Sequence, residues 1–70
     1  MNKPIKKGIY RHFKGEFYTV IEEGFDSETE IPVVIYQHND TKKIWVRPKH
    51  IFSDIIDHDG KKQIRFTFIR

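Results

Sequence analysis

Turn signals interrupt this chain roughly every eight to twelve residues, and that spacing constrains its fold more than any other feature. The runs between the turns are short and rich in aromatic and β-branched residues, as in residues 17–21 and 33–36. Such runs favour strands, and no apolar period of about three to four residues continues across the turns to indicate a helix. The sequence therefore predicts an all-β barrel or sandwich of five to six short antiparallel strands. A closed barrel would also leave no unpaired strand edge.

Most of these strands fall into three predicted hairpins: residues 9–13 with 16–21, 31–37 with 43–47, and 54–57 with 63–68. Lys14-Gly15 and Asp59-Gly60 supply two of the turns, because glycine accepts the positive φ that tight turns require.

Residues 49–53 and the final strand indicate which side chains fill the end of the expected barrel and its core. Residues 49–53 are too few for an ordinary helix and predict a single 3₁₀ turn, with Ile51 or Phe52 closing one end of the barrel. In the final strand, alternate positions place Ile64, Phe66 and Phe68 on one face.

Seventy residues make one domain near the lower size limit for a single core. The chain has no cysteine, so neither a disulfide nor a thiolate metal site supplements that core, and a reducing compartment suits it. No apolar run approaches the roughly 18 residues of a membrane span, and no apolar segment follows the basic N-terminus as in a signal peptide. We therefore expect a cytoplasmic protein without contact to a membrane.

The net charge of +3 is unevenly distributed along the chain. Residues 1–14 carry five Lys or Arg and no acid, residues 15–30 carry six acids and no base, and residues 31–70 carry eight bases against four acids. Residues 1–7 predict a flexible basic lead and residues 8–70 a single domain. A basic excess attracts polyanions, but this one is modest and the acidic block interrupts it.

The histidines and hydroxyl residues form no recognisable catalytic or metal motif. No histidine pair has the one-turn helical spacing of a metalloprotease, so we expect neither a metal nor another cofactor. Three histidines fall in or near predicted turns, where exposed histidine is ordinary, whereas His12 lies within a strand. Ser27 and Thr29 fall in the acidic loop 22–30, where turn and capping roles are the simpler interpretation than nucleophilic catalysis.

Residues 44–48 hold the only tryptophan, Trp45, close to Arg47 and Pro48. The chain has more aromatic residues than one small core buries with every polar tip satisfied, so some must be exposed. An exposed Trp45 near Arg47 would stack a base or grip a peptide. The alternative is that Trp45 is a core anchor and Arg47 pairs with the acidic loop.

A set of short motifs stands in order along the chain: Gly8-x-Tyr10-Arg11-His12-Phe13-Lys14-Gly15, Tyr18-x-Val20, Ser27-Glu28-Thr29, Val34-x-Tyr36, Trp45-Val46-Arg47-Pro48, Phe52, Asp59-Gly60 and Arg65-Phe66. Together they resemble the small bacterial proteins of domain-of-unknown-function family 1653, over about residues 8–68. The resemblance implies a small SH3-like β-barrel in a bacterial cytoplasmic protein, and it implies no established activity. The family often has a histidine before Ser-Glu-Thr, where this chain has Asp26.

Some motif residues are not obviously required by strand packing or turns: Arg11, His12, Ser27, Glu28, Thr29 and Arg47. We expect them to form one polar binding cluster near a barrel end, with Tyr10 and Trp45 beside it. The favoured function is a non-enzymatic binding module for a peptide or protein partner. The alternatives are nucleic-acid binding through Lys3, Lys6 and Lys7 with strand aromatics, and a small-molecule or hydrolase site pairing His12 with Glu28 or Ser27. The sequence does not set an oligomeric state.

Overall fold

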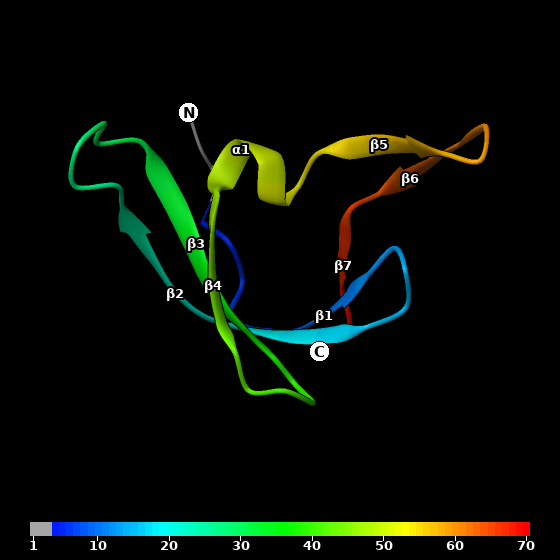
Figure 1. Cartoon of the computed structure of the whole chain (residues 1–70), viewed down its shortest axis with the longest axis horizontal. Helices are drawn as coiled ribbons and strands as arrows, with labels where there is room; N and C mark the ends of the chain where they lie inside the picture. Colours follow the sequence, from blue (N-terminus) through cyan, green and yellow to red (C-terminus); the bar gives the residue numbers. More distant parts are fainter. Residues whose placement is uncertain (1–3) are drawn as a thin grey trace.

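A computed structural model of the chain describes residues 4–70, which form a five-stranded antiparallel sheet, a two-stranded hairpin and one short helix (Figure 1). The elements are β1 (Gly8–His12), β2 (Phe17–Phe25), β3 (Pro32–His38), β4 (Ile44–Pro48), α1 (Lys49–Phe52), β5 (Ile55–His58), β6 (Lys61–Ile64) and β7 (Phe66–Phe68). The large sheet has the order β4-β3-β2-β1-β7, and β5 pairs with β6. The predicted all-β class is confirmed.

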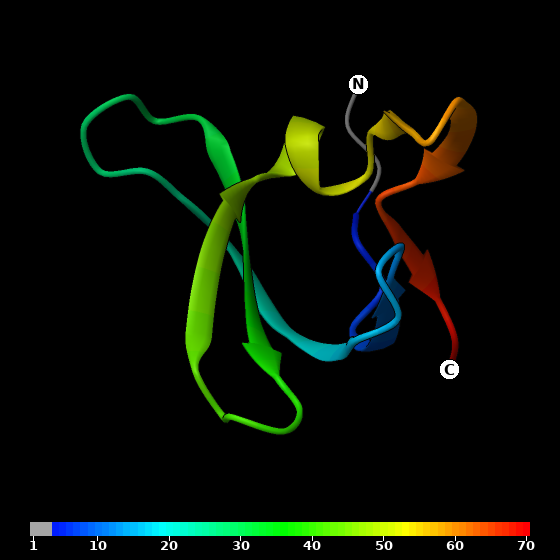
Figure 2. The same ribbon diagram turned by 45° about the vertical axis from the view of Figure 1, so that its right-hand side comes forward.

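The large sheet curves but does not close into the predicted barrel. Within the described residues, β4 pairs only with β3 and β7 pairs only with β1, so these two strands are its edges. Figure 2 shows them on opposite sides of the curved sheet. Pro48 ends β4 and leads into α1, and the chain then forms the β5–β6 hairpin, whose strands pair with each other and not with β4. These residues therefore do not bridge the two edges.

The curvature comes largely from β2, the longest strand. Its pairing with β3 shifts register between Val20 and Glu22, and such a bulge bends and twists a strand. The N-terminal part of β2 pairs with β1 and most of its length pairs with β3. The sheet therefore has a concave inner face.

The core lies on this inner face, under α1. Phe52 is 1% exposed and stacks on Phe66 with ring centroids 4.3 Å apart. Tyr10 and Tyr36 meet Phe52 edge to face at 5.4 and 5.3 Å. Phe52 thus has the core position expected from the sequence, although α1 is a four-residue α-helix and not a 3₁₀ turn.

The predicted final strand is divided into β6 and β7 at Arg65. The Arg65 N–H donates to the Asp54 carbonyl at 3.0 Å, and its Nε donates to Asp54 Oδ1 at 2.7 Å. The chain bends there, so Ile64 is exposed on β6 while Phe66 is buried on β7. The prediction that Ile64 shares a face with Phe66 is therefore wrong, because period-two alternation does not continue across a bend.

The predicted turns and the N-terminal segment complete the fold. Asp59 and Gly60 have φ of 53° and 76°, the two positive values of a type I′ hairpin turn. Of the predicted lead, residues 1–3 lie outside the described residues. Ile5 packs against the core, and its N–H donates to Glu23 Oε2 at 2.9 Å. Over residues 4–70, no helix is long and apolar enough to cross a membrane.

Candidate binding site on the inner face

Strand register places Trp45 and Arg47 on the inner face of the sheet. Trp45 lies directly opposite Tyr36, and Arg47 lies opposite Val34. Both partners are buried in the core, and opposed residues of paired strands share a face. The two candidates therefore lie beside the core at the edge of the sheet, where Trp45 remains 47% exposed.

Arg47 is held by its neighbour on β3. Its Nε donates a hydrogen bond to Tyr36 Oη at 3.1 Å, and Arg47 is half-buried. Within residues 4–70 no carboxylate lies at ion-pair distance from its guanidinium. The alternative considered from the sequence, in which Arg47 pairs with the acidic loop, is not formed, and its remaining N–H donors are available to a ligand.

His12 faces the same side, at the end of β1 opposite Phe66. Its ring meets Phe66 edge to face at 4.9 Å, and its Nδ1 accepts the Lys14 N–H at 3.2 Å. That acceptor role assigns the ring proton to Nε2. Burial, followed by the positive charges of Arg47 and Arg65, lowers the pKa of His12 from its ordinary value. His12 is thus a neutral imidazole close to two guanidinium groups.

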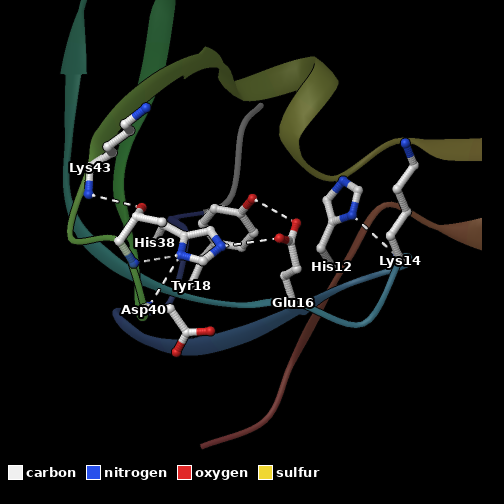
Figure 3. A network of polar contacts seen from close by, with 8 residues as sticks. His12, Lys14, Glu16, Tyr18, His38, Asp40 and Lys43 are labelled. Atoms are coloured by element: carbon white, nitrogen blue, oxygen red, sulfur yellow. Dashed lines mark hydrogen bonds and ion pairs between the residues drawn. The ribbon is translucent and has the colours of Figure 1, made fainter.

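A second histidine anchors the network shown in Figure 3. His38 is 8% exposed, and its Nδ1 accepts the Asp40 and Thr41 N–H groups, both at 3.1 Å. Its proton is therefore on Nε2, which donates to Glu16 Oε2 at 3.2 Å. The other Glu16 oxygen accepts the Tyr18 hydroxyl at 3.4 Å. The sequence predicted an exposed turn histidine here, but the turn's own N–H groups need a buried acceptor.

The electrostatics of this network follow from its hydrogen bonds. The hydrogen bond from His38 is the largest cause of the lowered pKa of Glu16. Burial, with the nearby Glu16 charge, raises the pKa of Tyr18. Glu16 is thus ionised and Tyr18 is a neutral donor at neutral pH. Figure 3 shows the Glu16 carboxylate between the rings of His38 and His12.

Two ion pairs fix the segments around α1. Lys49 Nζ lies 2.7 Å from Glu23 Oε1, and Arg65 Nε lies 2.7 Å from Asp54 Oδ1. The bond from Lys49 is the largest cause of the lowered pKa of Glu23, and the bond from Arg65 is the largest cause for Asp54. These two cations are therefore neutralised locally, whereas Arg47 has no ion-pair partner among the described residues.

The other candidates from β1 have separate surroundings. Tyr10 is a core residue, 7% exposed, and its hydroxyl donates to the Lys6 carbonyl at 2.8 Å. Arg11 is exposed and alternates onto the outer face, and it lines a hollow together with His12, Phe13 and residues of β6 and β7.

Ser27, Glu28 and Thr29 lie in the exposed loop between β2 and β3. Asp26 Oδ1 organises this loop by accepting the Glu28 N–H at 2.8 Å and the Thr29 N–H at 3.0 Å. These bonds, from Thr29 first, lower the pKa of Asp26. Asp26 is thus a turn-forming residue.

The structure places His12, Trp45 and Arg47 on the inner face, with Arg47 near enough to lower the pKa of His12, and separates them from the Ser27–Thr29 loop. His12 ends β1 beside the start of β2, because Arg11 pairs with Phe17. The loop follows the far end of β2 (Figure 1). The arrangement of His12 with Ser27 or Glu28 is therefore not formed. Among the described residues, no group of three or more His, Cys, Asp or Glu side chains is placed to hold a metal ion.

Several contributors were missed from the sequence: Glu16, Tyr18, Tyr36 and His38. Tyr18 and Tyr36 belong to the motifs Tyr18-x-Val20 and Val34-x-Tyr36. Strand alternation puts each tyrosine on the same face as the valine of its motif, and that was the signal for an inward position. Glu16 and His38 carry no local pattern, because only tertiary pairing brings them together.

The fold defines a small antiparallel β protein with an open edge strand and a polar, aromatic surface beside its core. The model of the family described as "Protein of unknown function (DUF1653)" matches residues 8–68, and the chain belongs to this family. A crystal structure of a DUF1653 protein from Bordetella bronchiseptica is similar, with a TM-score of 0.84 and 26% identity over 93% of this chain and 87% of that one. A search of curated proteins finds no match.

Proposed function

We propose that this chain is a non-enzymatic binding module whose partner is a peptide or a segment of another protein. The observation that carries the proposal is that the edge strand β4 holds two side chains, Arg47 and Trp45, that the rest of the described protein leaves accessible. Arg47 is held by Tyr36 with no carboxylate partner among the described residues, and Trp45, on the same face, is half-exposed. Tryptophan and arginine are the residues that most often dominate binding energy at protein interfaces.

The way these side chains are held supports recognition. Burial and the bond to Tyr36 restrict the Arg47 guanidinium before any partner arrives, which reduces the entropy lost on binding. His12 and Tyr18 extend the polar surface inward from the edge. A partner would thus meet an aromatic anchor, an oriented cation and neutral donors on one face.

The alternatives have less support. Of the lysines expected to contact nucleic acid, Lys7 pairs with Glu22 at 3.3 Å and Lys6 lies over the Phe68 ring, while Lys3 is outside the described residues. The hydrolase alternative lacks the geometry it requires, because His12 is not within reach of Ser27 or Glu28. As part of the same proposal, we place the protein in the bacterial cytoplasm, a reducing compartment that suits a chain without cysteine.

The test is capture of partners by the double variant Trp45→Ala/Arg47→Ala. Its matched control is Phe25→Ala/Lys62→Ala, which also removes one exposed aromatic and one exposed cation, but away from β4. Proteins retained from a bacterial lysate by wild type and by the control should be lost from the β4 variant, provided that all three show folded NMR spectra. Unchanged capture by a folded β4 variant would overturn the proposal.

A further inference from the structure

The outer side of β4 presents unpaired backbone groups. The His38 N–H donates to the Lys43 carbonyl at 2.9 Å, so Lys43 directs its carbonyl toward β3. Alternation in an antiparallel ladder then directs the backbone groups of Trp45 and Arg47 toward β3 as well. The N–H and C=O groups of Ile44 and Val46 consequently point away from β3, where the described residues supply no further strand.

The two faces of this edge differ in chemistry. Lys43, Trp45 and Arg47 alternate along the inner face, giving the order cation, aromatic, cation. Ile44 and Val46 lie on the outer face and are 54% and 62% exposed. An apolar, unpaired edge strand is a template for a further strand, and natural proteins usually cover or disrupt it.

Charge decides which strand fits. Residues 41–53 contain no acid and carry Lys42, Lys43, Arg47 and Lys49, of which Lys49 is paired with Glu23. A strand placed beside β4 would have its inward side chains directly opposite Lys43, Trp45 and Arg47. Acidic side chains opposite the two cations, and an apolar one opposite Trp45, complement this row.

We propose that the partner is an extended acidic segment that adds to β4 as a sixth strand, with the pattern acidic-x-apolar-x-acidic on its inward face. The inference rests on the proposed function and specifies its partner. Backbone bonds to Ile44 and Val46 supply affinity, and the row of Lys43, Trp45 and Arg47 supplies selection. The x positions face outward beside Ile44 and Val46, where β-branched residues pack best.

A second copy of this chain is a poorer occupant of the same edge. Antiparallel pairing of two β4 strands across Ile44 and Val46 places Lys43 of each copy opposite Arg47 of the other. Like charges directly opposed across strands are destabilising. The charge row that favours an acidic segment therefore disfavours this dimer.

The test uses the fluorescence of Trp45, the only tryptophan, in the full chain. The probe is the capped peptide Ser-Glu-Val-Leu-Val-Glu-Ser, whose core has the same pattern in either direction. Addition of the peptide should shift Trp45 emission saturably, with half-saturation below about 1 mM. Arg47→Ala should weaken this binding about fivefold or more, and so should raising the salt from about 0.05 M to about 0.5 M.

Matched peptides separate strand addition from charge attraction. Replacement of both glutamates by lysine should abolish the shift, because the charges then repel Lys43 and Arg47. N-methylation of both valines retains every charge but blocks the backbone bonds to Ile44 and Val46, and it should also abolish the shift. If the N-methylated peptide binds as well as its parent, strand addition is overturned.

Two further results would overturn the proposal that an acidic strand binds to β4. A parent peptide without saturable binding up to about 1 mM overturns the acidic-strand assignment, and so does a dT oligonucleotide that occupies the Trp45 site in its place. Neither result removes the broader proposal if Trp45→Ala/Arg47→Ala still loses its captured protein partner. If capture is unchanged as well, both proposals fail.

Discussion

The Arg47 Nε donates a 3.1 Å hydrogen bond to Tyr36 Oη, and this bond joins the edge strand to a core residue that is 3% exposed. The Tyr36 ring is itself fixed by edge-to-face contacts with Tyr18, Phe52 and Phe66. The position of the guanidinium therefore depends on core packing. The core thus sets the orientation of the guanidinium at the open edge of the sheet.

Tyr36→Phe tests this dependence. The variant keeps the ring and removes the hydroxyl, so the loss of one hydrogen bond should cost about 1 kcal/mol of unfolding free energy. Partner binding should weaken several-fold, because Arg47 is no longer held. Urea unfolding and partner capture measure the two effects. Thr19→Val, which removes a hydroxyl bonded to Asn39 Oδ1 and not part of the proposed binding surface, is the control and should leave capture intact.

Phe52 is the residue on which core stability depends most. Phe52→Ala should lower the unfolding free energy by about 3–5 kcal/mol, a large part of the stability of a domain this small. Phe25 is 74% exposed, so Phe25→Ala should change it by no more than about 0.5 kcal/mol. Urea unfolding of both variants checks the contrast. Equal losses would show that Phe52 does not close the core.

The pKa of His12 gives a spectroscopic test of the inner face. An NMR titration of its ring should show a midpoint below the ordinary value of 6.5, because burial and the charges of Arg47 and Arg65 lower the pKa. Arg47→Met should raise that midpoint by removing one of these charges. Lys42→Met removes an exposed cation that is not among the causes, and it should leave the midpoint unchanged.

The same shift predicts the direction of a stability change with pH. The folded pKa of His12 is lowered, so the unfolded chain takes up a proton first as the pH falls below about 6.5. The contribution of His12 to stability is therefore present above this pH and is lost as the pH falls through the folded pKa. Between pH 8 and pH 5.5, wild type should lose more unfolding free energy than His12→Phe. A steeper loss in the variant would reverse the assigned direction.

His38 should act mainly through the turn it supports. His38→Ala removes the acceptor of the Asp40 and Thr41 N–H groups and should cost about 1–3 kcal/mol. Asparagine offers a side-chain oxygen close to the position of Nδ1, so His38→Asn should recover about 1 kcal/mol of that loss. Urea unfolding compares them. No recovery would instead point to the Glu16 contact as the main role of His38.

Local chemistry made the strands and turns of this chain predictable. Asp59-Gly60 specifies a type I′ turn by itself, and Phe52, in the short turn after Pro48, lies in the core as expected. The open edge was not predictable, because it depends on where the chain goes after Pro48. The bend at Arg65 likewise depends on an ion pair with Asp54, distant in sequence.

Part of the candidate site was also predictable from local sequence, because strand alternation is a local pattern. Trp45 and Arg47 share a face through a two-residue spacing, which the sequence displays. The Ser27–Thr29 loop was grouped with them only by shared motif membership, and the length of β2 keeps the two apart. The unpaired state of Arg47 required knowledge of the partners of Glu23 and Asp54.

Amide hydrogen exchange at Ile44 and Val46 tests the open edge most directly. In the free protein these two amides should exchange rapidly, while those of Trp45 and Arg47, bonded to β3, should be protected. Saturation with the Glu-Val-Leu-Val-Glu peptide should slow exchange at Ile44 and Val46 by about tenfold or more. Rapid exchange that persists at both amides with the peptide bound, or protection of both in the free protein, would contradict an edge strand that receives its partner through the backbone.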